Sequence, residues 1–152
     1  MRLFHSVTVT VFSKEEDATQ EKAFRAFFPF VLEKEKLQLG KTKATGLSEK
    51  KITIYDVLLQ KEAHINRFLQ WLIDRLDKDQ KAMLLRQVDS RLDAELTFFL
   101  RFDRTAWNEE ERLLLVDHGD CYHLKMRVAA YPKERKAATA ILLNLLSPKE
   151  QP

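Results

Sequence analysis

The chain has 152 residues, of which 45% are apolar, and this is the size and composition of a single domain with one hydrophobic core. No apolar run approaches the ~18 residues that span a bilayer, so we expect no membrane partner, and a single cysteine excludes an intramolecular disulfide and fits a cytoplasmic protein. The net charge is only +3, so electrostatic binding requires that cations gather in one place.

The first part of the chain predicts strands around one helix. Residues 3–12 alternate apolar and polar side chains, which indicates a strand with one buried face. Residues 13–16, Ser-Lys-Glu-Glu, have the pattern of a capping box, so we expect a helix that ends near Phe28, before a proline. Residues 33–44 and 50–59 then predict a second and a third strand around a turn.

The middle of the chain carries the clearest helical period, over residues 61–76. Its apolar residues recur at the spacing of one helix face: Ile65, Phe68, Leu69, Leu72, Ile73 and Leu76. Asp77 or Asp79 then suits the N-cap of a following helix that contains Leu84 and Val88. We expect the apolar stripe to face the core.

Residues 96–103 and 121–128 alternate again and predict two further strands. One parity is apolar: Leu96, Phe98, Leu100, Phe102, Tyr122, Leu124, Met126 and Val128. The other parity, which we expect to face solvent, carries Thr97, Phe99, Arg101, Asp103, Cys121, His123, Lys125 and Arg127. An aromatic residue and three cations on one wet face indicate a surface that faces nucleic acid.

The segments beside these strands are predicted from turn signals. Residues 104–112 indicate a short helix or a loop. Residues 113–116 are expected to pair with 121–128 through a tight turn at Gly119. The last helix is expected to start at Tyr131-Pro132, because proline suits the first turn of a helix.

The order of these elements predicts an α+β fold. Strands and helices are mixed without a strict βαβ rhythm, and several neighbouring strands are joined by short turns. We therefore expect a single domain over residues 1–147, with a mainly antiparallel sheet, helices packed on one face, and a flexible tail at 148–152.

Scarce glycine argues against several classes of enzyme. The three glycines, at positions 40, 46 and 119, lie too far apart for a phosphate-binding loop or a dinucleotide fingerprint. The chain also lacks a Gly-x-Ser-x-Gly elbow and a His-Glu-x-x-His pair. We therefore expect no cofactor and no catalytic residues of these kinds.

Two acidic features admit a catalytic and a structural interpretation. Asp103 beside Arg101 and Arg104 could act in a metal-dependent ribonuclease, but an ion pair at a strand end is the commoner arrangement. Residues 117–123 hold two aspartates, two histidines and a cysteine, which zinc accepts as ligands. A polar hairpin turn is the alternative, and we favour it, so no metal site is expected.

The basic residues favour RNA as the partner. Lys125, Arg127, Lys133, Arg135 and Lys136 follow one another against a single acid, Glu134, and Arg101 and Arg104 join them if the two strands are neighbours. Cations neutralise phosphates, and an exposed Phe99, with Tyr55 as a second candidate, can stack on an unpaired base. The alternative is a solvated face on which Phe99 is covered by a loop or a second subunit.

A protein-interaction module or homodimer is the competing hypothesis. In that case the sheet face or the last helix docks a partner, and Phe99, Trp107 and Leu146 are the interface anchors.

Several motifs resemble those of a known archaeal family. They are residues 13–17 with the Phe-rich helix that ends at Pro29, and then Ile65–Phe68, Phe98–Arg104 and Tyr131–Arg135. With these motifs the chain resembles the archaeal RNA-binding proteins also described as predicted exosome subunits. Within the central motif Thr105 and Trp107 depart from the family pattern, as does the segment 43–46.

The resemblance implies a fold similar to that of the ribosomal protein that binds 5S rRNA in the large subunit. It also implies an archaeal cytoplasmic protein that takes part in RNA processing, with RNA and an RNA-processing complex as partners. None of the motifs is a catalytic signature, so the resemblance agrees with a non-enzymatic function.

Overall fold

The computed structural model describes residues 2–14, 18–45 and 51–148, and in these ranges the strands form one antiparallel sheet. The strand order is β2-β3-β1-β5-β4, with every neighbouring pair antiparallel. The strands are β1 (Phe4–Ser13), β2 (Gly40–Thr45), β3 (Lys51–Leu59), β4 (Thr97–Asp103) and β5 (Cys121–Val128). The predicted α+β class is confirmed.

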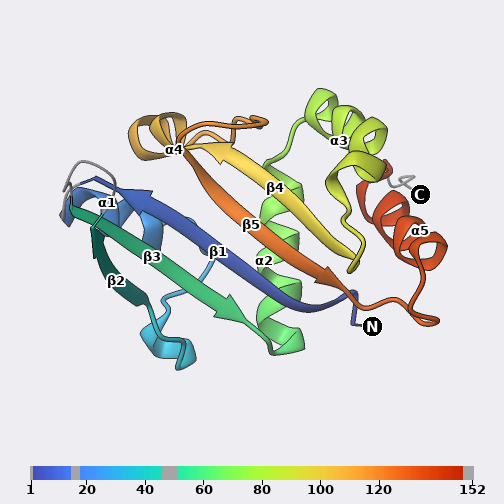
Figure 1. The fold of residues 1–152 in the computed structure, drawn as a ribbon, viewed down its shortest axis with the longest axis horizontal. Coiled ribbons are helices and arrows are strands. Elements are labelled where there is room, and N and C mark those ends of the chain that lie inside the picture. Colours follow the sequence, from blue (N-terminus) through green and yellow to red (C-terminus); the bar gives the residue numbers. More distant parts are fainter. Residues whose placement is uncertain (1, 15–17, 46–50, 149–152) are drawn as a thin grey trace.

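Helices cover one face of this sheet and leave the other open. They are α1 (Ala18–Arg25), α2 (Glu62–Arg75), α3 (Lys78–Arg91), α4 (Arg104–Glu110) and α5 (Arg135–Leu146). In Figure 1 the sheet lies in front of α2, with α1 and α4 at one end and α3 and α5 at the other. The uncovered side, which faces the viewer in that figure, is called the open face below.

None of the helices within the described ranges is both long and apolar enough to cross a bilayer.

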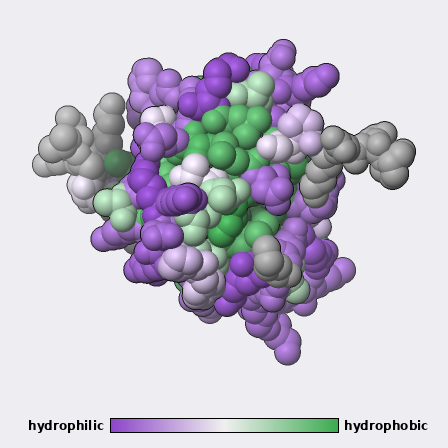
Figure 2. Space-filling model, turned by 90° about the vertical axis from the view of Figure 1, so that its right-hand side faces the viewer, coloured by the Kyte–Doolittle hydropathy of each residue, from purple (hydrophilic) through white to green (hydrophobic). Residues whose placement is uncertain are grey.

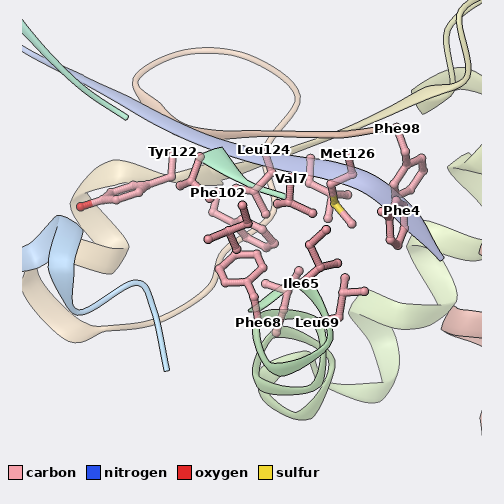
Figure 3. Close-up of a cluster of buried hydrophobic side chains, with 14 of the residues drawn as sticks. Phe4, Val7, Ile65, Phe68, Leu69, Phe98, Phe102, Tyr122, Leu124 and Met126 are labelled. Carbon is pink, nitrogen blue, oxygen red and sulfur yellow. The ribbon is translucent and has the colours of Figure 1, made fainter. Parts of the chain in front are cut away.

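The core forms where the apolar stripe of α2 meets the covered face of the sheet. In Figure 3, Ile65, Phe68 and Leu69 of α2 point toward the sheet side chains. Those side chains are Phe4 and Val7 of β1 together with the predicted apolar parity of β4 and β5, and all of them are buried. Burial of a large apolar side chain contributes roughly 1.5–3 kcal/mol each, so this contact holds the helix layer on the sheet.

A cluster of aromatic rings joins the segment after α1 to the same core. Phe27 stacks on Tyr122, with ring centroids 4.7 Å apart and planes at 10°, and meets Trp107 edge-on at 5.0 Å. The indole nitrogen of Trp107 donates a 2.8 Å hydrogen bond to the carbonyl of Ala23. Trp107 and Leu146 are fully buried, so their predicted role as interface anchors is wrong.

Local signals located the start of α3 correctly. The Asp77 carboxylate accepts a 2.8 Å hydrogen bond from the Gln80 amide, and the Gln80 side chain accepts one of 3.1 Å from the Asp77 amide. These two bonds form a capping box, which satisfies backbone donors that a helix start leaves open. Residues 15 and 16 of the other expected capping box, residues 46–48 of the expected turn, residue 50 of the expected third strand and residues 149–152 of the expected tail lie outside the described ranges.

Two strand predictions were wrong. The second strand begins at Gly40 rather than at residue 33, because Glu33–Glu35 form a short 3₁₀ turn and Lys36 has a left-handed backbone, with φ of 58°. Residues 113–116 run beside β4 instead of β5, since the Asp103 amide donates to the Leu114 carbonyl at 2.8 Å. Both edges of β5 are occupied by β1 and β4, so no edge is left for a further strand.

The ends of two helices also differ from the prediction. α1 ends at Arg25 rather than near Phe28, because the Phe27 amide bonds to the Phe24 carbonyl and tightens the last turn. α5 begins at Arg135 rather than at Tyr131-Pro132, since Glu134 keeps an extended backbone. Proline permits a helix start but does not impose one.

Candidate nucleic-acid interface

The polar parities of β4 and β5 come together on the open face, as predicted, but the expectation that Thr97 faces solvent is wrong, because Thr97 is buried. The antiparallel register places Phe99 opposite Lys125, Arg101 opposite His123 and Thr97 opposite Arg127. Directly opposed side chains have Cβ atoms about 4.5–5.5 Å apart. One aromatic ring, one imidazole and three cations therefore form a continuous patch, which we call the basic patch: Phe99, Arg101, His123, Lys125 and Arg127.

The aromatic part of the patch consists of two rings. Phe99 is half-buried and lies nearly parallel to His123, with ring centroids 6.0 Å apart and planes at 25°. Burial lowers the pKa of His123 below its ordinary value, and the charges of Arg101 and Lys125 lower it further. His123 is therefore neutral at pH 7, and its ring extends the apolar surface of Phe99.

Tyr55 does not belong to this surface. It lies on β3 with the parity that faces the helices, and it is fully buried beside Phe24. Its predicted role as a second stacking platform is wrong, because one residue of register places a side chain on the opposite face of a sheet. Ile54 and Asp56 face the open side in its place.

Arg104 is the first residue of α4, directly after β4, and is engaged within the protein. Its guanidinium bonds Asp120 Oδ2 at 2.7 Å through Nε and at the same distance through Nη2, and it reaches Gln20 Oε1 at 3.2 Å. The hydrogen bond to Asp120 raises the pKa of Arg104, so the group stays charged. An RNA phosphate at Arg104 would have to compete with these partners.

Arg135 is engaged in the same way at the start of α5. Its guanidinium donates to Asp89 Oδ1 at 2.8 Å and to the backbone carbonyls of Asp89 and Leu92 at 2.6 and 3.0 Å. These bonds tie α5 to the C-terminal end of α3. Its neighbours Lys133 and Lys136 are exposed.

The acidic features have structural roles. Asp103 Oδ2 accepts a 2.9 Å hydrogen bond from the Ala106 amide and so caps α4. Asp117 pairs with Arg91 at 3.2 Å, and Asp120 pairs with Arg104. Burial raises the pKa of Cys121, which favours the neutral thiol over the thiolate that binds zinc.

Across residues 2–14, 18–45 and 51–148, no three His, Cys, Asp or Glu side chains are grouped closely enough to hold a metal ion.

Sequence reasoning left two residues near the patch out of the RNA contact. It placed His123 on the same face as Lys125 and Arg127 through the alternation, which the structure confirms, but gave it no role in the site. Arg91 is the last residue of α3 and is buried against β4, where its Nη1 donates to the Phe99 carbonyl at 3.4 Å. No local pattern indicates that contact, because it joins a helix end to a strand edge.

Solved structures share this fold. Protein AF2318 from Archaeoglobus fulgidus superposes with a TM-score of 0.80 at 23% identity, over 93% of this chain and 99% of that one. Mth689 from Methanothermobacter thermautotrophicus, described as a DUF54 protein, gives a TM-score of 0.76 at 22% identity, over 95% of this chain and 99% of that one.

Sequence comparison adds a curated relative and a family. The RNA-binding protein PAB1135 of Pyrococcus abyssi is 23% identical over 137 residues, which cover 88% of this chain and 87% of that protein. The model of the family described as RNA binding matches residues 6–128. Because that match covers well over half of the chain, the protein belongs to this RNA-binding family.

Proposed function

We propose that this protein binds RNA without cleaving it, and that the basic patch on the open face makes the contact. The observation that carries the proposal is the shared face of Phe99, Arg101, Lys125 and Arg127 on two hydrogen-bonded strands. The family of the chain and its curated relative support RNA as the ligand.

The cations of the patch are available to phosphates. Lys125 and Arg127 are exposed, and no ion pair engages them or Arg101 among the described residues. Arg104 and Arg135, by contrast, use their guanidinium groups inside the protein. We therefore assign Arg101, Lys125 and Arg127 to the RNA backbone. Lys133 and Lys136 join them if the RNA extends past the end of β5. We expect Arg104 and Arg135 to contribute less to RNA affinity.

The ring of Phe99 favours unpaired RNA over a duplex. A base that stacks on an aromatic side chain gains about 1–3 kcal/mol, and only an unpaired base can leave its own stack to do so. The parallel His123 ring widens the platform on which such a base lies.

Fluorescence anisotropy with labelled single-stranded and duplex RNA, titrated across salt, tests the proposal. We expect tighter binding of the single strand and a logarithm of affinity that falls linearly with the logarithm of salt concentration, because cations released from the RNA drive binding. Absence of binding to either RNA at low salt would overturn the proposal.

A charge reversal tests the position of the contact. Lys125→Glu with Arg127→Glu should weaken binding strongly and flatten the salt slope by about 0.7 for each phosphate that the protein no longer neutralises. Lys78→Glu with Arg86→Glu is the matched control, since both residues are exposed on α3 in the helical layer. Equal decreases in affinity in the two double variants would mean that only net charge matters.

The proposal also includes a role in the cell. The family resemblance suggests an accessory of RNA processing or of exosome-linked degradation in an archaeal cytoplasm. Copurification of a tagged protein with RNA-processing subunits, retained after nuclease treatment, tests this assignment. A ribonuclease is the less favoured alternative, and RNA incubated with Mg²⁺ or Mn²⁺ should show no cleavage that depends on Asp103.

A protein-interaction surface is the second candidate function. Figure 2 shows the side of the molecule formed by α3 and α5, where apolar residues gather inside a hydrophilic rim. Leu143 of α5 is 40% exposed and Tyr131 is 79% exposed. Light scattering of the protein and of Leu143→Glu tests whether α5 forms a homodimer, and a monomer in both cases rejects that arrangement.

A further inference from the structure

A cavity of about 480 Å³ opens beside the basic patch, between the last turn of α3 and the edge of β4. Phe99 and Arg101 line it from the strand, Gln87 and Arg91 from the helix, and Asp117 from the turn that precedes β5. The volume lies in the ordinary range for small-ligand sites, about 300–1,000 Å³. Phe99 and Arg101 belong to both surfaces, so an RNA bound to the basic patch would pass the mouth of this cavity.

The polar group on the helical wall of the cavity is the guanidinium of Arg91, which hydrogen bonds hold in place. The Arg91 side chain is 8% exposed, and its Nε donates a 2.8 Å hydrogen bond to Gln87 Oε1. Its Nη2 donates to Asp117 Oδ1 at 3.2 Å. Burial lowers the pKa of Arg91, the Asp117 carboxylate opposes that change, and the nearby charge of Arg101 adds to it.

Asp117 is held by this contact and remains open to a ligand. Its side chain is 78% exposed, and among the described residues Arg91 is its one ion-pair partner, through Oδ1. A carboxylate fixed at one oxygen can accept hydrogen bonds from N–H groups at the other. Arg101, on the strand side, contributes a guanidinium that donates.

We propose that this cavity binds one unpaired guanine of the RNA, with its ring on Phe99. Guanine presents two acceptors, O6 and N7, on one edge, which match the fork of Arg101. It presents two donors, N1–H and N2–H, on the adjoining edge, which match the carboxylate of Asp117. Adenine presents one donor and one acceptor to each of these two side chains, so it matches neither of them fully. The pyrimidines present less ring area to Phe99. This inference rests on the proposed RNA-binding function and adds base preference to it.

Anisotropy with labelled oligouridylates of one length, which differ only in one central guanine, adenine, cytosine or uracil, tests the proposal. The wild-type protein should prefer guanine by roughly tenfold, the size expected for one well-formed bidentate contact. Asp117→Asn should remove most of that preference while it preserves the affinity for oligouridylate. Glu109→Gln is the matched control, because it removes the same charge from an exposed residue of α4.

Arg101→Lys provides a second, independent variant. It keeps the charge but lacks the planar fork, so the ratio of guanine to uracil affinity should fall, whereas any loss of a backbone contact at this residue should lower the affinity for all four oligonucleotides alike. Far-ultraviolet circular dichroism of each variant checks that the fold is intact.

The outcomes separate this inference from the proposed function. Equal wild-type affinity for all four oligonucleotides, or a guanine preference that both variants retain, overturns the guanine site and leaves the RNA-binding patch standing. No affinity for any of the four at low salt overturns both.

Discussion

Tyr122 and Asn108 are joined by a 2.6 Å hydrogen bond, which the phenol hydroxyl donates to Asn108 Oδ1. Asn108 in turn donates to Gln20 Oε1 at 2.8 Å, and Gln20 donates back to the Tyr122 oxygen at 2.9 Å. This closed ring links β5, α4 and α1. It therefore fixes the end of β5 that lies next to the basic patch.

Tyr122→Phe should destabilise the fold by about 1–3 kcal/mol, because it leaves the buried amide of Gln20 and the partly buried amide of Asn108 short of a partner while the ring still stacks on Phe27. Urea denaturation followed by circular dichroism measures the change. Tyr131→Phe is the control, since that side chain is exposed, and it should alter stability by less than about 0.5 kcal/mol. A similar small effect of both changes would show that the hydrogen-bonded ring contributes little.

The same tyrosine should make the fold sensitive to alkali. Burial raises the pKa of Tyr122 above its ordinary value, although the hydrogen bond from Gln20 and the charge of Arg104 oppose the change. In the unfolded chain a tyrosine ionises near pH 10. The contribution of Tyr122 to the free energy of unfolding is therefore complete below about pH 10. It decreases as the pH rises further, because only the unfolded chain releases the proton.

Unfolding free energies measured at pH 8 and above pH 10 check this prediction. The decrease should be smaller in Tyr122→Phe than in the wild type. An identical decrease in the two proteins would assign the alkaline sensitivity to other groups.

Arg104 should matter for folding more than for RNA. Arg104→Gln removes the bonds to Asp120 and weakens the contact with Gln20, and we expect a decrease of roughly 1–2 kcal/mol in stability. The affinity of the folded variant for RNA should change much less than that of the Lys125 and Arg127 double variant. Arg112→Gln, at a more exposed arginine, is the control. A decrease in RNA affinity in Arg104→Gln with unchanged stability would place Arg104 in the RNA contact instead.

His123 should report RNA on the open face. Its pKa is lowered in the free protein, so its imidazole resonance should titrate below about pH 6.5. A phosphate beside Arg101 and Lys125 offsets their charges and favours the protonated ring, so RNA should raise this pKa. NMR titration of the free protein and of its complex with single-stranded RNA measures this pKa. An unchanged His123 titration at saturating RNA would place the RNA elsewhere.

His123 also has a consequence for stability. Its pKa is lower in the folded protein than in the unfolded chain, so its contribution to the free energy of unfolding is complete above about pH 6.5. This contribution decreases as the pH falls, because the unfolded chain takes up the proton first. His123→Gln should reduce this acid sensitivity.

Much of the fold and most of the patch follow from local pattern. The alternation over β4 and β5 was enough to place Phe99, Arg101, Lys125 and Arg127 on one face, because a strand turns successive side chains to opposite sides. The stripe of α2 and the N-cap of α3 were visible for the same reason, since helical spacing and capping involve neighbours along the chain. Each of these features is specified within a few residues.

Only the tertiary structure decided which basic residues remain available to a ligand. Arg104 and Arg127 look alike in the sequence, yet Asp120 and Gln20 engage the first, while the second is exposed. The tertiary structure also determines that residues 113–116 lie along β4. It brings Arg91 and Asp117 together with Phe99 and Arg101 around one cavity. The physical reason is distance along the chain. Periodicity within an element decides which way a side chain points, but the residues that neutralise its charge lie far away in the sequence. Only the packing of helices and strands decides whether they reach it.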